Sequence, residues 1–159
     1  MRVGLGYDVH AFAPGRRLVL GGVEIPYPRG LAGHSDADVL THALMDAILG
    51  AMRMGDIGQH FPDTDQRWRD ADSLELLRNI GEMMRGSGWF LVDADCVLVL
   101  EQPKVAPYRD GMRQAMAAAL GVAVEQIGLK ATTTEGLGFS GRGEGVAAQA
   151  VALLEWVSS

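Results

Sequence analysis

The chain opens with a strict alternation of side-chain types, and this feature constrains the fold more than any other. Apolar residues occupy every second position from Val3 to Val9, and two glycines followed by Asp8 and His10 occupy the positions between and after them. A period of two residues predicts a β-strand whose two faces differ. Residues two apart on a strand share a face and lie roughly 6.5–7 Å apart. The sequence therefore predicts an opening strand with two metal-binding side chains on its bare, polar face.

A helix that follows residue 38 carries a third metal-binding side chain. Ser35 and Asp38 have the spacing of a helix N-cap and a capping-box acid. Apolar residues then recur at helical spacing over residues 39–51 and form one stripe. His42 and Asp46 fall nearly opposite that stripe, so we expect His42 to face solvent, a cleft or a neighbouring subunit. Asp46 lies one turn further on and is expected to hold the second ring nitrogen of His42.

Asp8, His10 and His42 form a candidate zinc site. Two imidazoles and one carboxylate suit Zn²⁺, and three protein ligands leave one tetrahedral position open, as in catalytic zinc sites. The alternative for each residue is an ordinary surface or hydrogen-bonded role, which is commoner for a single histidine. The zinc prediction therefore depends on the fold bringing the helix against the strand.

The rest of the chain alternates predicted strands and helices. A glycine turn at Gly21-Gly22 predicts a hairpin over residues 17–26. Residues 54–70 form a long polar loop, and loops of this length in compact domains are often functional. The later patterns predict helix 73–86, strand 89–101, helix 107–120 and strand 127–133. Residues 145–157 have a composition that permits either a helix or a buried strand, and their periodicity does not decide between them.

Length and charge restrict the class of protein. A chain of 159 residues is close to the commonest size of one domain, so we expect residues 1–159 to form a single domain. A net charge of −6 argues against a nucleic-acid partner or an anionic membrane surface. A phosphorylated substrate then needs local positive charge, which metal ions can supply.

The cysteine content and the start of the chain indicate a reducing compartment. Cys96 is the single cysteine, which excludes an internal disulfide, and its apolar neighbours predict a small buried hydrophobe. The first residues show no signal or transit segment, and no apolar stretch approaches membrane-spanning length. A cytoplasmic protein is therefore expected.

Three further segments carry polar side chains that fit either a site or an ordinary turn. The loop around Asp56 and Asp63 is a solvated acidic turn, or a cluster that binds the hydroxyls of a polyol. Segment 130–138 is a threonine-rich strand end that only favours β-structure, or a segment whose hydroxyl and backbone N–H groups cradle phosphate oxygens. Glu135 within it is a hard oxygen ligand suited to Mg²⁺ or Mn²⁺. Lys104 is an exposed lysine or a phosphate contact.

Taken together, the motifs resemble the family of 2-C-methyl-D-erythritol 2,4-cyclodiphosphate synthases, which act in non-mevalonate isoprenoid biosynthesis. The resemblance extends from Val3 to Leu154 and rests on five motifs in the family's order. They are Asp8-Val9-His10, Gly33 to Asp38 with His42, Gly55-Asp56-Ile57-Gly58 with His60 to Asp63, Thr132 to Glu135, and Phe139 to Gly145. The resemblance implies an α+β fold, in which a mixed sheet has helices packed on one face and residues 145–157 form a strand.

The resemblance implies an enzyme, a phosphorus–oxygen lyase that uses two metals. Its substrate is 4-diphosphocytidyl-2-C-methyl-D-erythritol 2-phosphate. The 2-phosphate attacks the β-phosphorus, CMP leaves, and 2-C-methyl-D-erythritol 2,4-cyclodiphosphate forms. By the resemblance, Asp8, His10 and His42 bind Zn²⁺, and Glu135 is associated with a second divalent cation, Mg²⁺ or Mn²⁺.

The resemblance also implies catalytic and substrate-binding residues. His34 and Thr133 are the catalytic residues that polarise the phosphates in the transition state. The acidic loop holds the erythritol part, and the segment after the strand 89–101 holds the cytidine diphosphate. The substrate-binding residues are Ser35, Asp56, Ile57, Gly58, Phe61, Pro62, Asp63, Thr64, Asp65, Leu100, Glu101, Gln102, Pro103, Lys104, Val105, Ala106, Thr132, Thr134, Phe139 and Arg142.

Family members are homotrimers with active sites between neighbouring subunits, and their three sheets meet around the three-fold axis. This assembly accounts for a His42 that points away from its own apolar stripe. Phe139, Arg142 and Glu144 match residues that line a central cavity, which can hold an isoprenoid diphosphate. The alternative for this segment is a flexible turn with a surface pair between Arg142 and Glu144.

The same residues are also compatible with two other classes of protein, a zinc hydrolase and a non-catalytic binding module. A different zinc enzyme, a hydrolase, would release linear products instead of CMP and a cyclic diphosphate. A non-catalytic trimeric module would bind isoprenoid diphosphates through Arg142 and would survive the loss of Asp8 and His10. The ordered set of motifs favours the synthase over both alternatives.

Overall fold

A mixed sheet of five strands forms the base of the structure, a computed structural model that describes residues 1–157. The strands lie in the order β4-β1-β7-β5-β6. β5 and β6 pair in parallel, and the other neighbours are antiparallel. A separate hairpin joins β2 and β3. The strands are β1 Arg2–Pro14, β2 Leu18–Leu20, β3 Val23–Ile25, β4 Arg29–Leu31, β5 Trp89–Val99, β6 Ile127–Thr132 and β7 Gly145–Trp156.

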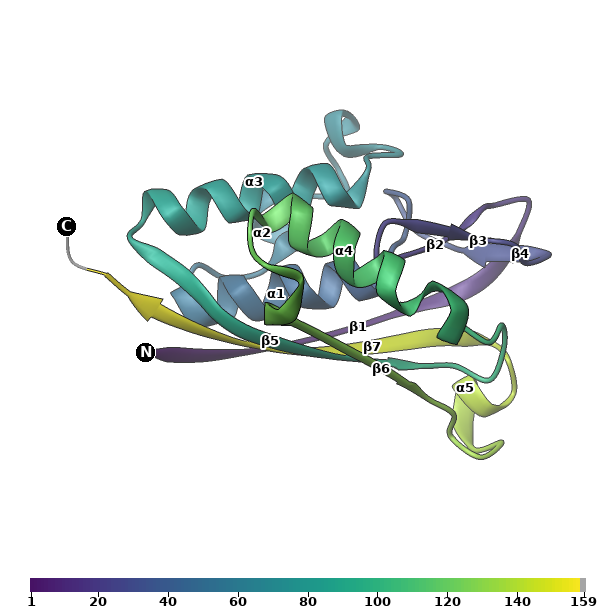
Figure 1. Cartoon of the computed structure of the whole chain (residues 1–159). Coiled ribbons are helices and arrows are strands. Elements are labelled where there is room, and N and C mark those ends of the chain that lie inside the picture. Colours follow the sequence, from purple (N-terminus) through teal and green to yellow (C-terminus); the bar gives the residue numbers. More distant parts are fainter. Residues whose placement is uncertain (158–159) are drawn as a thin grey trace.

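The long helices all lie on one face of this sheet (Figure 1). α1 packs directly against β1 and β7, while α3 and α4 contact each other. The helices are α1 Val39–Met52, α2 Ile57–His60, α3 Ser73–Gly86, α4 Arg109–Leu120 and α5 Gly138–Gly141, with 3₁₀ turns η1 Gln66–Trp68, η2 Ala106–Tyr108 and η3 Val124–Gln126. Across residues 1–157, no helix has both the length and the apolar character needed to span a bilayer. The predicted α+β class is confirmed, and β7 settles the open alternative for residues 145–157 as a strand.

Two glycines on β1 let α1 approach the sheet closely. A Cβ atom on Gly6 would lie 1.8 Å from Ala43 O, and one on Gly4 would lie 1.9 Å from Ala47 O. Any side chain at these positions would therefore push the helix away from the strand. The two candidate ligands of β1 come next on the same face, since side chains alternate along a strand. They consequently meet the N-terminal half of α1.

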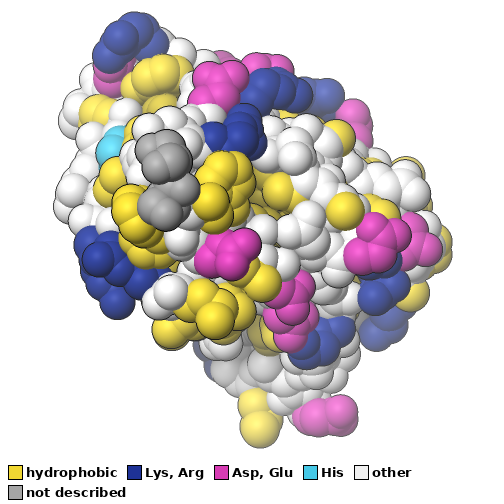
Figure 2. Space-filling view, turned by 60° about the vertical axis from the view of Figure 1, so that its left-hand side comes forward, with side chains coloured by type: hydrophobic (Ala, Val, Ile, Leu, Met, Phe, Trp, Pro, Cys, Tyr) yellow, Lys and Arg dark blue, Asp and Glu magenta, His cyan; other side chains and the backbone are white. Residues whose placement is uncertain are grey.

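The opposite face of β1 carries its apolar side chains and is left open in the single chain. Leu5 is 68% exposed and Tyr7 is 55% exposed. Val151 on β7 lies opposite Leu5 in the sheet register and is also exposed. Hydrophobic side chains also gather at the end of the molecule with the termini (Figure 2), and the exposed residues there include Phe90 and Trp156. The sheet thus presents apolar surface on the side away from its helices.

The start of α1 differs from the prediction that placed the N-cap at Ser35. Asp38 is the N-cap, and its carboxylate accepts the backbone N–H of Thr41 at 3.0 Å. The segment before it forms bends, and Ala37 has a φ of 57°, a left-handed conformation that an α-helix does not contain. Asp38 also accepts the backbone N–H groups of the two glycines in the β2–β3 turn. One carboxylate therefore joins the helix to the hairpin.

Two further expectations concern the polar loop and the cysteine. The predicted long polar loop over residues 54–70 contains the short helix α2 and the turn η1, which the sequence analysis did not predict. Cys96 is fully buried, as predicted, and burial raises the pKa of its thiol to about 12. The thiol is therefore a packing group with no thiolate at neutral pH.

We expect Gly6→Ala to destabilise the protein by about 3 kcal/mol or more, because the added methyl group overlaps the Ala43 carbonyl. Gly86→Ala is the matched control, since a Cβ at this last residue of α3 would meet no atom within 4 Å. Its free energy of unfolding should stay within about 1 kcal/mol of the wild-type value. Urea unfolding of both variants measures the difference. Equal stabilities would contradict the close approach of α1 to β1.

Candidate functional site

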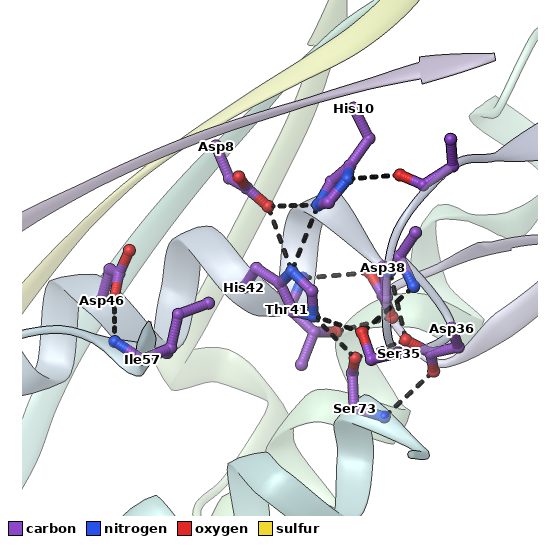
Figure 3. Close-up of polar contacts among 12 residues, drawn as sticks. Asp8, His10, Ser35, Asp36, Asp38, Thr41, His42, Asp46, Ile57 and Ser73 are labelled. Atoms are coloured by element: carbon purple, nitrogen blue, oxygen red, sulfur yellow. Dashed lines mark hydrogen bonds and ion pairs between the residues drawn. The ribbon is translucent and has the colours of Figure 1, made fainter. Parts of the chain in front are cut away.

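Three side chains from two elements converge at the centre of the candidate site (Figure 3). Asp8 and His10 come from β1, and His42 comes from α1. Asp8 Oδ2 lies 2.9 Å from His10 Nε2 and 3.1 Å from His42 Nδ1, and the two nitrogens are 3.3 Å apart. Within residues 1–157, no other group of three metal-ligating side chains comes together in this way. The fold therefore brings the helix against the strand, as the zinc prediction requires.

A backbone carbonyl sets the orientation of the His10 ring. His10 Nδ1 lies 2.7 Å from Ala32 O, and a carbonyl oxygen only accepts, so Nδ1 is the donor. Nε2 is therefore the nitrogen that is available to a cation, and it faces Asp8 and His42. Gly33 leaves room for the ring, since a Cβ there would lie 3.2 Å from His10 Cε1.

The second ring nitrogen of His42 contacts two serines and does not contact Asp46. His42 Nε2 lies 3.2 Å from Ser35 Oγ and 3.0 Å from Ser73 Oγ. The carboxylate of Asp46 instead accepts the backbone N–H of Ile57 at 2.8 Å, at the start of α2. The prediction that Asp46 holds His42 is therefore wrong, because a backbone donor from the following loop occupies the carboxylate.

The electrostatics of the three side chains favour a positive charge between them. Burial alone raises the pKa of Asp8, but hydrogen bonds and positive charge from His10 and His42 lower it to about 2. Burial lowers the pKa of His10, but the hydrogen bond and the charge of Asp8 outweigh this and raise the pKa above its ordinary value. Asp8 thus stays ionised at neutral pH and favours a proton or a metal cation beside it.

The arrangement fits a tetrahedral metal ion such as zinc. Zinc bonds of roughly 2.0–2.1 Å to nitrogen and oxygen put neighbouring ligand atoms about 3.3 Å apart. The three separations, from 2.9 to 3.3 Å, are close to that value. The donor set of two nitrogens and one carboxylate oxygen also suits zinc. The three residues line a pocket, which leaves room for a fourth ligand.

The pocket around the three side chains has a volume of about 400 Å³. Six other residues predicted from the sequence line it, namely His34, Ser35, Ile57, Gly58, Phe61 and Asp63. Sequence reasoning missed Trp68 and Leu76, which also line the pocket. Trp68 packs edge-on against Phe61, with ring centroids 5.0 Å apart. The available signal for Trp68 was an aromatic ring in an otherwise polar loop.

Four residues of the acidic loop that were predicted to bind substrate do not line this pocket, namely Asp56, Pro62, Thr64 and Asp65. Asp56 caps α2 by accepting the backbone N–H of Gln59 at 3.0 Å. Both carboxylate oxygens of Asp65 accept donors of Arg67, at 2.6 to 3.0 Å. The carbonyl oxygen of Asp65 lies 3.3 Å from His34 Nε2. These contacts organise the loop around the pocket.

A second pocket, of about 300 Å³, lies between β6, η2 and α4. Its predicted members are Leu100, Pro103, Lys104, Val105, Ala106, Thr132 and Thr133. Lys130 and Ala131 also line it and belong to segment 130–138, the candidate phosphate cradle. Sequence reasoning missed Arg109, Met112 and Leu129, because α4 and β6 meet only in the fold. Lys130 pairs with Asp95, whereas Lys104 donates only to the carbonyl of Glu101 at 3.2 Å. Lys104 is therefore a positive charge without a paired carboxylate among residues 1–157.

The turn after β6 is held by Glu101, which does not line the second pocket. Glu101 Oε1 accepts the backbone N–H and the hydroxyl of Thr134 and the backbone N–H of Gly136, at 3.0 to 3.3 Å. Glu135 sits between them with a left-handed φ of 55°. Gln102 and Thr134 are likewise absent from both pocket linings. The contacts give Glu101 the role of a support for the turn that presents Glu135.

The single chain does not bring Glu135 and Thr133 to the Asp8–His10–His42 cluster. β1 and β6 are separated in the sheet by β7 and β5. Three strand spacings correspond to about 14 Å across the sheet. The predicted metal-binding and catalytic residues are consequently divided. His34 lines the first pocket with the cluster, Thr133 lines the second pocket, and Glu135 lines neither.

The segment around α5 also lies apart from both pockets. Arg142 Nε donates to Glu144 Oε1 at 2.8 Å, and Arg142 Nη2 lies 3.3 Å from Glu144 Oε2. Both side chains are exposed and follow α5, in which Phe139 is the second residue. The surface pair between Arg142 and Glu144 is therefore present in the single chain.

Comparison with known proteins gives a consistent result along the whole chain. The YgbB family model matches residues 1–155. The 2-C-methyl-D-erythritol 2,4-cyclodiphosphate synthase of Moorella thermoacetica is 62% identical over 154 residues, which cover 97% of this chain and 94% of the relative. A solved structure of a synthase of the same name, in a form with bound CDP, has a TM-score of 0.88 and 41% identity and covers 97% of this chain and 100% of that one.

A larger protein also contains this fold. The bifunctional IspDF of Campylobacter jejuni has a TM-score of 0.94 and 42% identity, and the match covers 99% of this chain. This chain spans 42% of that bifunctional protein.

We expect His42→Ala to bind Zn²⁺ more than about 100-fold more weakly than the wild type, because one of the three converging ligands is lost. His60→Ala is the matched control, since His60 lies outside the cluster and contacts the Met54 carbonyl. Chelator competition measures the affinity, and circular dichroism checks that both variants fold. Unchanged zinc binding in folded His42→Ala would contradict the site.

Proposed function

This chain belongs to the YgbB family, and we propose that it converts 4-diphosphocytidyl-2-C-methyl-D-erythritol 2-phosphate to 2-C-methyl-D-erythritol 2,4-cyclodiphosphate with release of CMP. It would act as a phosphorus–oxygen lyase and a single catalytic domain, in the non-mevalonate isoprenoid pathway of the cytoplasm. The observation that carries this proposal is the cluster of Asp8, His10 and His42 at the pocket that also collects His34 and Asp63.

The pocket around the cluster suits the erythritol part of the substrate. Phe61 and Ile57 offer apolar contact to the carbon chain and its methyl group. The carboxylate of Asp63 accepts hydrogen bonds from hydroxyl groups. His34 also lines this pocket, and its Nε2 faces the Asp65 carbonyl, so a ring with both nitrogens protonated would donate from Nδ1 to a phosphate oxygen, which makes it the proposed catalytic donor of this pocket.

The second pocket suits the cytidine diphosphate part. Its lining is mostly apolar, which favours a flat base, and Lys104 brings a free positive charge for a phosphate. Thr132 and Thr133 lie at the end of β6 and offer hydroxyl groups to phosphate oxygens. Glu135 lies on the adjoining turn as the proposed ligand of a second divalent cation, Mg²⁺ or Mn²⁺.

The reaction needs little covalent help from the protein. Phosphoryl transfer within one substrate needs two phosphates held close and in line, with their charge neutralised. Bound Zn²⁺ and a second divalent cation would supply that neutralisation, which an acidic chain with a net charge of −6 does not supply by itself. The side chains therefore bind and orient the two ends of the substrate, and no protein nucleophile is required.

The separation of the two pockets supports a homotrimer in which neighbouring chains share each active site. Leu5, Tyr7 and Val151 leave apolar surface on the free face of the sheet, and a neighbouring chain would cover it. In such a trimer the sheets meet around the axis, and the second pocket of one chain faces the metal cluster of the next. Phe139, Arg142 and Glu144 would line the axial cavity, where Arg142 would meet an isoprenoid diphosphate.

We expect purified protein with the cytidyl substrate, Zn²⁺ and Mg²⁺ to release CMP and form the cyclic diphosphate, because both ends of the substrate have a pocket. Phosphorus NMR identifies the product, and protein stripped of metal by a chelator is the control. Linear phosphorylated products would instead indicate a zinc hydrolase. Absence of any turnover together with binding of an isoprenoid diphosphate would indicate the non-catalytic module.

We expect Leu5→Asp to convert the trimer to monomers, because it places a charge in the apolar face that the neighbouring chain covers. Ala118→Asp is the matched control, since Ala118 is exposed on α4 on the helical side of the molecule. Sedimentation velocity gives the assembly state of each variant. A trimer that persists in Leu5→Asp, or a wild-type monomer, would contradict this interface.

A further inference from the structure

Asp36 and Ser73 form a hydrogen-bonded pair on the far side of the His42 ring from Asp8 and His10 (Figure 3). Asp36 lies in the bend before α1, and Ser73 is the first residue of α3. We propose that this pair fixes the proton of the His42 ring on Nε2 and so keeps Nδ1 free for a cation. Asp36 and Ser73 are then positioning residues of the metal site. The inference deepens the proposed function and rests on its metal site.

The carboxylate of Asp36 fixes the direction of the Ser73 hydroxyl. Asp36 Oδ1 accepts the hydroxyl of Ser73, and Asp36 Oδ2 accepts the backbone N–H of Ser73 at 3.0 Å. A carboxylate has lone pairs but no proton to donate. Ser73 has one hydroxyl proton, so that proton points to Asp36.

The oxygen of Ser73 can then act only as an acceptor toward His42. Ser73 Oγ lies 3.0 Å from His42 Nε2. Because the hydroxyl proton is already donated, the contact requires the proton to sit on Nε2. In a neutral imidazole the other nitrogen then carries a free lone pair. That nitrogen is Nδ1, which faces Asp8 and His10.

Ser35 contacts the same nitrogen but does not decide where the proton lies. Ser35 Oγ is 3.2 Å from His42 Nε2 and accepts the backbone N–H of Ala37 at 3.2 Å. Among residues 1–157, no carboxylate or carbonyl group accepts the hydroxyl proton of Ser35. Ser35 is therefore free to accept from a protonated Nε2 or to donate to a bare one. Asp36 accepts the hydroxyl proton of Ser73, so Ser73, unlike Ser35, can act only as an acceptor toward Nε2.

Asp8 acts in the opposite direction when the site holds no cation. Asp8 Oδ2 lies 3.1 Å from His42 Nδ1, and as an acceptor it draws the ring proton toward Nδ1. A ring with its proton on Nδ1 has no lone pair for a cation at that position. The Asp36–Ser73 pair opposes this shift, much as the Ala32 carbonyl orients His10. Partners of this outer kind typically change metal affinity by about 10–100-fold.

The first experiment locates the ring proton of His42 in metal-free wild-type protein at a fixed pH. Nitrogen NMR of protein labelled with ¹⁵N-histidine distinguishes the two ring nitrogens, and the spectrum of His42→Ala assigns the signals. We expect the proton on Nε2. A bare Nε2 with the proton on Nδ1 overturns the proposal, whatever the variants show.

The second experiment removes each member of the pair. Ser73→Ala deletes the hydroxyl and keeps the backbone N–H that Asp36 accepts. Asp36→Asn keeps the size of the side chain but adds an amide that can donate to Ser73 Oγ, so the hydroxyl is released to donate to Nε2. Both variants should shift the single ring proton of His42 from Nε2 toward Nδ1. They should also weaken Zn²⁺ binding by about 10–100-fold in chelator competition.

Ser140→Ala is the matched control for the loss of a buried hydroxyl. Ser140 is 2% exposed, and its hydroxyl has no hydrogen-bond partner within residues 1–157. Its Zn²⁺ affinity should equal that of the wild type. Folded Ser73→Ala that binds Zn²⁺ as tightly as Ser140→Ala overturns the proposal.

The measurements separate this inference from the synthase activity. None of them uses the cytidyl substrate. A failure of the Asp36–Ser73 pair to fix the His42 proton is therefore distinguished from a lack of synthase activity. If circular dichroism shows that Ser73→Ala or Asp36→Asn does not fold, the ring proton of the wild-type protein decides the question by itself.

Discussion

The close contact between α1 and β1 is the constraint on which the rest of the structure depends. Gly4 and Gly6 have no Cβ, so the carbonyls of α1 lie where side chains would otherwise stand. The same face of β1 continues into Asp8 and His10, and the same helix carries His42. The three ligand atoms therefore meet because the backbones are close. A wider gap between helix and sheet would separate them even if every ligand were kept.

A buried carboxylate extends this constraint to the segment 33–38 before the helix. Asp38 is fully buried, and burial together with the charge of Asp36 raises its pKa. Its oxygens accept four donors, two from the β2–β3 turn and two from Thr41, so the group is not left unsatisfied. From the other side, Arg16 donates to two carbonyls of the same segment. Segment 33–38, beside the candidate metal cluster, is thus held by Asp38 on one side and by Arg16 on the other.

Elements with a local period could be predicted from the sequence, whereas features that depend on tertiary contacts could not. The alternation of residues 3–10 was sufficient for the strand and its ligand face, and the helical pattern placed His42. Asp46 also satisfied the helical pattern, but the partner of its carboxylate is set by a turn that no period describes. Ser73, which contacts His42, lies 31 residues away from it and arrives only when α3 packs on α1. The division of the site between two pockets results from strand order, which a single sequence does not specify.

The alternation that builds the metal cluster also determines the outer surface of the sheet. Since β1 turns its glycine and ligand positions toward α1, its apolar positions must point to the other side. In the single chain Leu5 and Tyr7 are left exposed there, at a cost that a neighbouring sheet would remove. Moving these apolar residues inward would need a shift by one position, which would also turn Asp8 outward. The candidate metal site and the proposed assembly therefore depend on the same register of β1, so a shift of that register would alter both.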